Sequence, residues 1–88
     1  MRLNKKFRLN KVAGEYMLLD TSARSVNLSK VFSVSEPAAW LWEKIGDADF
    51  DEPMLVDMLC GEYDVTREIA TEDVRNMVRL WNEYGMLL

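Results

Sequence analysis

Histidine is absent from the 88-residue chain, and cysteine occurs once, as Cys60. Without histidine the chain lacks the commonest general base and transition-metal ligand, and it cannot pair histidine with a serine or cysteine nucleophile. A single thiol excludes an intrachain disulfide, and one thiolate with carboxylates is poor structural zinc chemistry. These absences argue against an enzyme, a disulfide-stapled secreted domain and a zinc protein. We therefore expect no catalytic residue, metal or cofactor.

Long apolar runs are also missing. No stretch approaches the roughly 20 residues needed to cross a bilayer, and residues 1–10 contain no uninterrupted apolar segment of the signal-peptide kind. Yet 49% of the residues are hydrophobic, which is too many for a disordered chain. Repeats and Pro/Gly/Ser-rich linkers are not found, so the sequence predicts one soluble, cytoplasmic domain spanning residues 1–88.

The net charge of −4 is unevenly distributed along the chain. Residues 1–30 contain seven Lys or Arg and two acidic residues, whereas residues 31–88 contain four and thirteen. Such an asymmetry bears first on solubility and partners and not on the fold. A solvated basic strand region beside a solvated acidic helical region accounts for it.

Three short segments at the start of the chain are typical of β-strands. In residues 7–12, apolar and polar side chains alternate as far as Lys11, and Ala13-Gly14 separates this segment from a second one at residues 15–21, which is apolar at consecutive positions. This tight glycine-containing connection predicts an antiparallel hairpin. Since the second run is apolar at consecutive positions, we expect both of its faces to be covered, as in a middle strand. Residues 30–34 then predict a third, edge strand.

Three helices are predicted in the remainder. Ser35-Glu36-Pro37 begins the first, which ends at Gly46, and Asp51-Glu52-Pro53 begins the second. Thr66 is the expected N-cap of the third helix, which runs to about Tyr84. The fold class is therefore α+β: a winged-helix-like domain in which a three-stranded antiparallel sheet precedes three helices, in the order βββααα.

Four segments also match the pattern of a known family in their order and spacing. They are Ala13–Leu19 at the hairpin, Val34–Glu43 at the first helix, Leu59–Val65 after the second helix, and Asp73-Val74 with Glu83–Leu87 in and after the third. Together they resemble the PqqD-like family (coenzyme PQQ synthesis protein D). Its members are also called RiPP recognition elements, for ribosomally synthesised and post-translationally modified peptides. The resemblance covers residues 7–88.

The resemblance implies a non-catalytic peptide chaperone of natural product biosynthesis. Members of the family bind the leader segment of a precursor peptide as an extra strand at the exposed edge of the third strand, against the third helix. They present it to a modifying enzyme, often a radical-SAM protein.

The residues themselves can support such a site. An edge strand offers unpaired N–H and C=O groups, and adaptable methionine beside rigid tryptophan is suited to gripping peptide side chains. The apolar helix residues can equally belong to the core, and the two arginines can either hold acidic leader residues or pair with Glu72 or Glu83. The predicted peptide-binding residues are Lys30, Val31, Phe32, Ser33, Val34, Val74, Arg75, Met77, Val78, Arg79 and Trp81.

Two other functions compete with this interpretation. A general interaction module could pair the open edge with a second copy of itself, giving a homodimer. A winged helix could also bind DNA, but residues 51–64 contain five acids and no base, and residues 67–84 contain three arginines against four acids. Neither helix could neutralise phosphates, so we expect no nucleic-acid partner.

Overall fold

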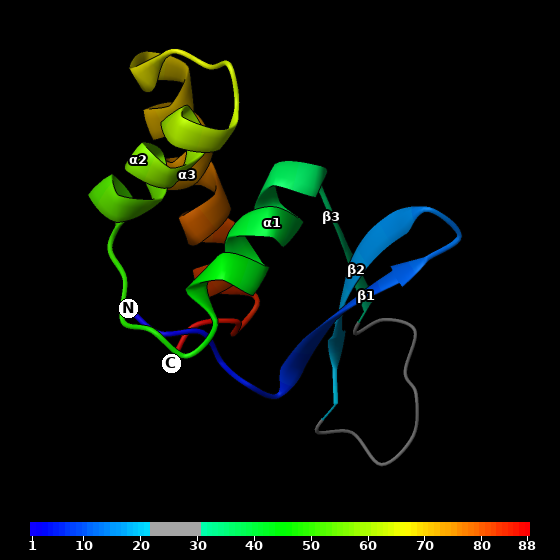
Figure 1. Ribbon diagram of the computed structural model, residues 1–88. Coiled ribbons are helices and arrows are strands. Elements are labelled where there is room, and N and C mark those ends of the chain that lie inside the picture. The colour runs from blue at the N-terminus through cyan, green and yellow to red at the C-terminus, as the bar shows by residue number, and fades with distance from the viewer. Residues whose placement is uncertain (22–30) are drawn as a thin grey trace.

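The computed structural model describes residues 1–21 and 31–88. It has the predicted βββααα order, with one antiparallel sheet of order β1-β2-β3 (Figure 1). Lys30, placed by the sequence in the third strand, lies outside the described residues. None of the helices in these ranges is long and apolar enough to cross a bilayer. The elements are β1 (Phe7–Val12), β2 (Glu15–Asp20), β3 (Val31–Val34), α1 (Glu36–Ile45), α2 (Glu52–Glu62) and α3 (Arg67–Glu83).

The hairpin between β1 and β2 turns through two residues with positive φ, Ala13 at 52° and Gly14 at 83°. This is the turn whose twist matches that of the flanking strands. β2 is the middle strand, as predicted. Its Leu18 is buried against the helices, whereas Met17 and Leu19 on the other face are half-buried. The expected cover on both faces is therefore only partial in the described residues.

Each helix begins at a side chain that accepts a backbone hydrogen bond. Ser35, Asp51 and Thr66 accept from the N–H three residues further on, at 3.3, 2.9 and 3.2 Å. Such bonds satisfy N–H groups that have no partner within the helix. The predicted starts of all three helices are confirmed.

The core joins the sheet to the helices through α1, which Figure 1 shows between the sheet and the α2–α3 pair. The largest fully buried side chains come from four elements, namely Leu18 of β2, Leu41 of α1, Leu55 of α2 and Val74 of α3. Trp81 of α3 packs edge-on against Trp42 of α1, with ring centroids 5.2 Å apart. Burial of these apolar side chains is the main force that holds α3 at a fixed distance from the sheet.

The first residues of the chain pair with the residues that follow α3. Leu3 forms a β-bridge with Leu87, and the Asn4 N–H donates to the Met86 carbonyl at 2.8 Å. The Asn4 side-chain amide donates to the Gly85 carbonyl at 2.9 Å. These bonds fix the backbone of Met86, whose side chain is buried beside the last turn of α3.

Replacing Leu55 by alanine should lower the free energy of unfolding by about 2–5 kcal/mol, because the side chain is 0% exposed and its removal leaves a cavity. The neighbouring Met54 is 36% exposed, so M54A should cost less than about 1 kcal/mol. Urea unfolding of both variants checks this. Equal losses would show that the core does not include Leu55.

Lys5 holds the pKa of the Asp47 carboxyl below its usual value, through a hydrogen bond and through its charge. The two groups lie 2.8 Å apart. The folded-state pKa is depressed, so this pair contributes stability above the ordinary carboxyl pKa and loses it as the pH falls through the folded value. In an NMR titration, K5A should raise the pKa of Asp47 toward 3.8. An unchanged midpoint would contradict the assignment.

Candidate functional site

The outer edge of β3 is unpaired in the described part of the chain. β3 bonds to β2 on one side, with Tyr16 opposite Val34 and Leu18 opposite Phe32. No described strand pairs with its other side, which borders a hollow also lined by α3. The predicted edge position is therefore confirmed.

The hairpin turn decides which backbone groups of β3 point outward. Val12 and Glu15 flank a two-residue turn and so exchange both hydrogen bonds, and this pattern alternates along the ladder. The Thr21 N–H donates to the Lys6 carbonyl at 2.7 Å, as this alternation predicts for the pair. Glu15 and its alternate neighbours along β2 thus point to β1, and the residues between them point to β3.

The backbone of β3 is consequently divided in two. Phe32 and Val34 lie opposite the β2 residues that point toward β3, so their N–H and C=O groups bond to β2. The N–H and C=O groups of Val31 and Ser33 point to the open side. Two residues of β3 are therefore free to pair with an additional strand.

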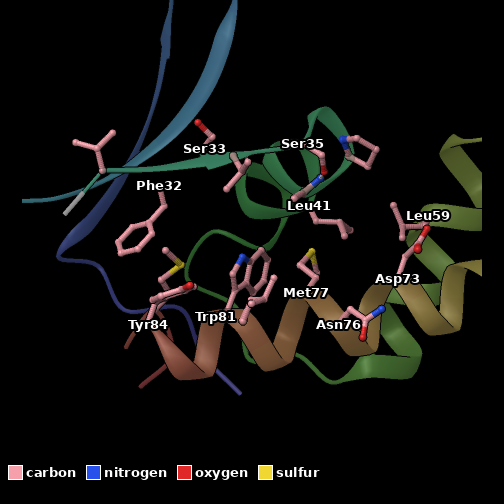
Figure 2. Close-up of a pocket in the computed structure, with 16 residues that line it drawn as sticks. Phe32, Ser33, Ser35, Leu41, Leu59, Asp73, Asn76, Met77, Trp81 and Tyr84 are labelled. Atoms are coloured by element: carbon pink, nitrogen blue, oxygen red, sulfur yellow. Dashed lines mark hydrogen bonds between the residues drawn. The ribbon is translucent and has the colours of Figure 1, made fainter. Parts of the chain in front are cut away.

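A groove of about 780 Å³ lies along this open edge. Its walls are β3, the first turn of α1 and one face of α3, and the residue after α3 completes it at one end (Figure 2). Most of the lining side chains are apolar. They are Val31, Phe32, Ser33, Val34, Ser35, Pro37, Ala38, Leu41, Leu59, Asp73, Asn76, Met77, Leu80, Trp81, Tyr84 and Met86.

The bottom of the groove is part of the core. Leu41, Trp81 and Met86 are buried, and Figure 2 shows Leu41 and Trp81 between β3 and α3. Phe32 and Tyr84 meet across one end with ring centroids 4.7 Å apart. These contacts give the groove a rigid apolar floor and one closed end.

The outer lip of the groove comes from α3 and is more exposed. Asp73, Asn76 and Leu80 line it at helical spacing, followed by Tyr84. Leu80 is 43% exposed and Tyr84 is 50% exposed. An incoming apolar side chain could bury this surface, which gives the groove affinity for apolar residues.

The structure brings together six of the eleven predicted residues. Val31, Phe32, Ser33 and Val34 line the groove from β3, and Met77 and Trp81 line it from α3. They meet because β3 and α3 form opposite walls of the same groove (Figure 2).

The other four described residues do not line the groove. Val74 and Val78 are buried in the core, which was the alternative expected for them. Arg75 and Arg79 are each two residues from Met77, and at 3.6 residues per turn this places them about 160° from it around α3. Both are exposed on the side away from the groove. The two arginines therefore do not line the groove with β3, and their contact with acidic leader residues stays a prediction.

The outer lip of the groove and the lining residues from α1 and α2 were not predicted from the sequence. Asp73, Asn76 and Leu80 lie three or four residues from Met77, so helical spacing could have placed them beside it. Ser35, Pro37 and Leu59 carry no such signal, because their places in the groove depend on how α1 and α2 pack in the folded domain.

The shape and lining of the groove suit an extended chain. Asp73 is the one carboxylate among its described lining residues. The hydroxyl of Ser33 lies on the other face of the sheet, so the remaining polar groups are the hydroxyl of Ser35, the amide of Asn76, the indole N–H of Trp81 and the phenol of Tyr84. An apolar floor, a few hydrogen-bonding groups and a free strand edge are the features of strand-addition sites.

Amide hydrogen exchange tests the division of β3 directly. In the free protein the N–H groups of Phe32 and Val34 should exchange more slowly than those of Val31 and Ser33, because only the former bond to β2. Residue-resolved exchange by NMR measures this. Equal protection of Ser33 and Phe32 would contradict the assigned phase.

Comparison with known proteins places the chain in a family. The model of the PqqD family, described as coenzyme PQQ synthesis protein D, matches residues 15–87. A search of curated protein sequences gives no significant match. Among solved structures, the lasso peptide synthetase B1 complexed with the leader peptide is similar at a TM-score of 0.70, with 25% identity over 99% of this chain and 95% of that one. TbiB1 in complex with the TbiA(β) leader peptide has a TM-score of 0.72, with 20% identity over 99% of this chain and 94% of that one. The family match spans nearly all of the fold that builds the groove, and the chain belongs to the PqqD family.

Proposed function

We propose that this protein is a non-catalytic module that binds the leader segment of a ribosomally synthesised precursor peptide and presents it to a modifying enzyme. The observation that carries the proposal is the open edge of β3 beside an apolar groove. The leader adds as a fourth strand through Val31 and Ser33. The modifying enzyme, of the radical-SAM class in our proposal, supplies the chemistry.

The geometry of the edge predicts the pattern of the bound segment. Side chains of paired residues lie on the same face of a sheet. Peptide residues opposite Phe32 and Val34 would therefore point into the groove, and those opposite Val31 and Ser33 would point away from it. A bound leader should alternate apolar residues with residues of any kind over this stretch.

Backbone pairing and side-chain burial contribute differently to binding. The backbone hydrogen bonds to Val31 and Ser33 do not depend on the side chains of the peptide, so they contribute affinity and fix the register. Burial of apolar leader side chains against Met77, Leu80 and Tyr84 adds about 25 cal/mol for each Å² removed from water. Choice among peptides therefore depends on the groove and not on the strand edge.

The structural relatives support the same use of the fold. Both similar structures are named as complexes with a leader peptide. Their overlap with nearly the whole of this chain includes the strand and the helix that form the groove. A homodimer formed by β3 edges would occupy the same backbone groups, so peptide and second copy would compete.

A proline at position 33 tests the proposal with little disturbance of the sheet. Its N–H points away from β2, so S33P should leave the pairing of β2 and β3 intact while removing one bond to the guest strand. Synthetic leader segments of short precursors encoded beside this gene, titrated calorimetrically, should bind S33P at least about five times more weakly. S33A keeps the N–H and should change affinity by less than about twofold.

Two results would speak against the proposal. If leader peptides bind the S33P variant and the unmodified protein equally, the peptide does not use the β3 edge. If light scattering shows a dimer that added leader peptide leaves intact, the edge serves self-association instead. The melting temperature of S33P, compared with that of S33A, controls for loss of folding.

A further inference from the structure

The two ends of the groove differ in charge, although its floor is apolar throughout. Figure 2 shows Tyr84 at one end and Asp73 at the other. Asp73 is the charged residue among the described residues that line the groove. Within the described ranges its carboxylate takes no part in the ion pairs or side-chain hydrogen bonds. Among the residues that the structure describes, the negative charge at this end of the groove therefore has no paired cation.

The start of α1 lies at this same end, but several of its first N–H groups are already bonded or missing. A helix N-terminus attracts anions through its free N–H groups. Here the Ala38 N–H bonds to the Ser35 hydroxyl at 3.3 Å, the Ala39 N–H bonds to the Ser35 carbonyl at 2.9 Å, and Pro37 has no N–H. Glu36 adds a second carboxylate in the first turn.

The basic side chains of α3 are directed elsewhere. Arg75 and Arg79 lie on the side of the helix away from the groove. Arg67, at the start of α3, is 2.7 Å from the carboxylate of Asp57 in α2. In the part of the chain that the structure describes, no lysine or arginine lines the groove.

The direction of a bound peptide relates this charge to the peptide sequence. β3 runs from Phe32, which contacts Tyr84, toward Ser35, at the end where Asp73 lies. The sheet is antiparallel, and antiparallel pairing is slightly more stable than parallel pairing. An antiparallel guest would enter beside Ser35 and leave beside Val31, so its N-terminal residues would lie near Asp73.

We propose that Asp73 is a specificity-determining residue that selects peptides with a lysine or arginine on the N-terminal side of the apolar residues filling the groove. This inference rests on the proposed peptide-binding function. A basic side chain at that point can reach the carboxylate while its aliphatic part covers the exposed lip. An acidic side chain there meets a like charge with no described cation to offset it.

Selection from a library of random 12-residue peptides displayed on phage tests both the charge and its position. The unmodified protein, D73K and E72K each serve as bait. The E72K substitution makes the same change in charge on the same helix as D73K, but Glu72 does not line the groove. Only phage that fail to bind the S33P variant count as groove-dependent.

The proposal predicts lysine or arginine N-terminal to the apolar positions with the unmodified protein and E72K, and aspartate or glutamate there with D73K. A synthetic lysine-containing peptide from the selection should bind D73N about two to five times more weakly. It should bind E72Q with unchanged affinity, and the effect of D73N should shrink at high salt.

The outcomes separate this inference from the function on which it rests. Groove-dependent peptides without a charge preference, or with the basic residue on the C-terminal side, overturn the role of Asp73 and leave peptide binding intact. A failure to select any groove-dependent peptide overturns both. Circular dichroism of D73K and E72K shows whether either substitution has damaged the fold.

Discussion

The division of backbone hydrogen bonds along β3 is the constraint on which the site depends. Because the two-residue turn at Ala13 and Gly14 sets the phase of the β1–β2 ladder, it also sets which residues of β2 point toward β3. Phe32 and Val34 are thereby committed to the sheet, and Val31 and Ser33 are left facing outward. A shift of one residue in this register would exchange the two pairs and would turn the Phe32 ring away from the core.

Packing of α3 converts that free edge into a groove. Trp81 is held edge-on against Trp42 and Phe50, and it is at once a core residue and part of the groove floor. The residue pairing between the start of the chain and the segment after α3 fixes Met86 at the closed end. The spacing between β3 and α3 is thus a property of the whole core, so a change in core packing also changes the groove.

The order of elements and their starts could be predicted from the sequence because local signals set them. The tight Ala13-Gly14 turn, the N-cap side chains and the spacing of apolar residues all act within a few positions. The residues of the groove could be predicted less completely from such local signals. The apolar stripe of α3 turned out to serve two surfaces, with Val74 and Val78 in the core and Met77 in the groove. Periodicity defines a stripe, but only the placement of β3 and α1 decides which part of it stays open. The same holds for Arg75 and Arg79: their mutual spacing puts them on one side of α3, but only their angle from Met77 shows that this side is not the groove.

The most direct test of the central claim is a set of intermolecular nuclear Overhauser effects between isotope-labelled protein and a bound, unlabelled leader peptide. If the peptide pairs antiparallel through Val31 and Ser33, then Phe32 sits in a non-hydrogen-bonded pair with it, where the two Hα atoms come close. The account predicts an Hα–Hα cross-peak between Phe32 and the peptide, with further cross-peaks to the Met77 side chain. Cross-peaks confined to β1, or to the face of α3 that carries Arg75 and Arg79, would contradict it.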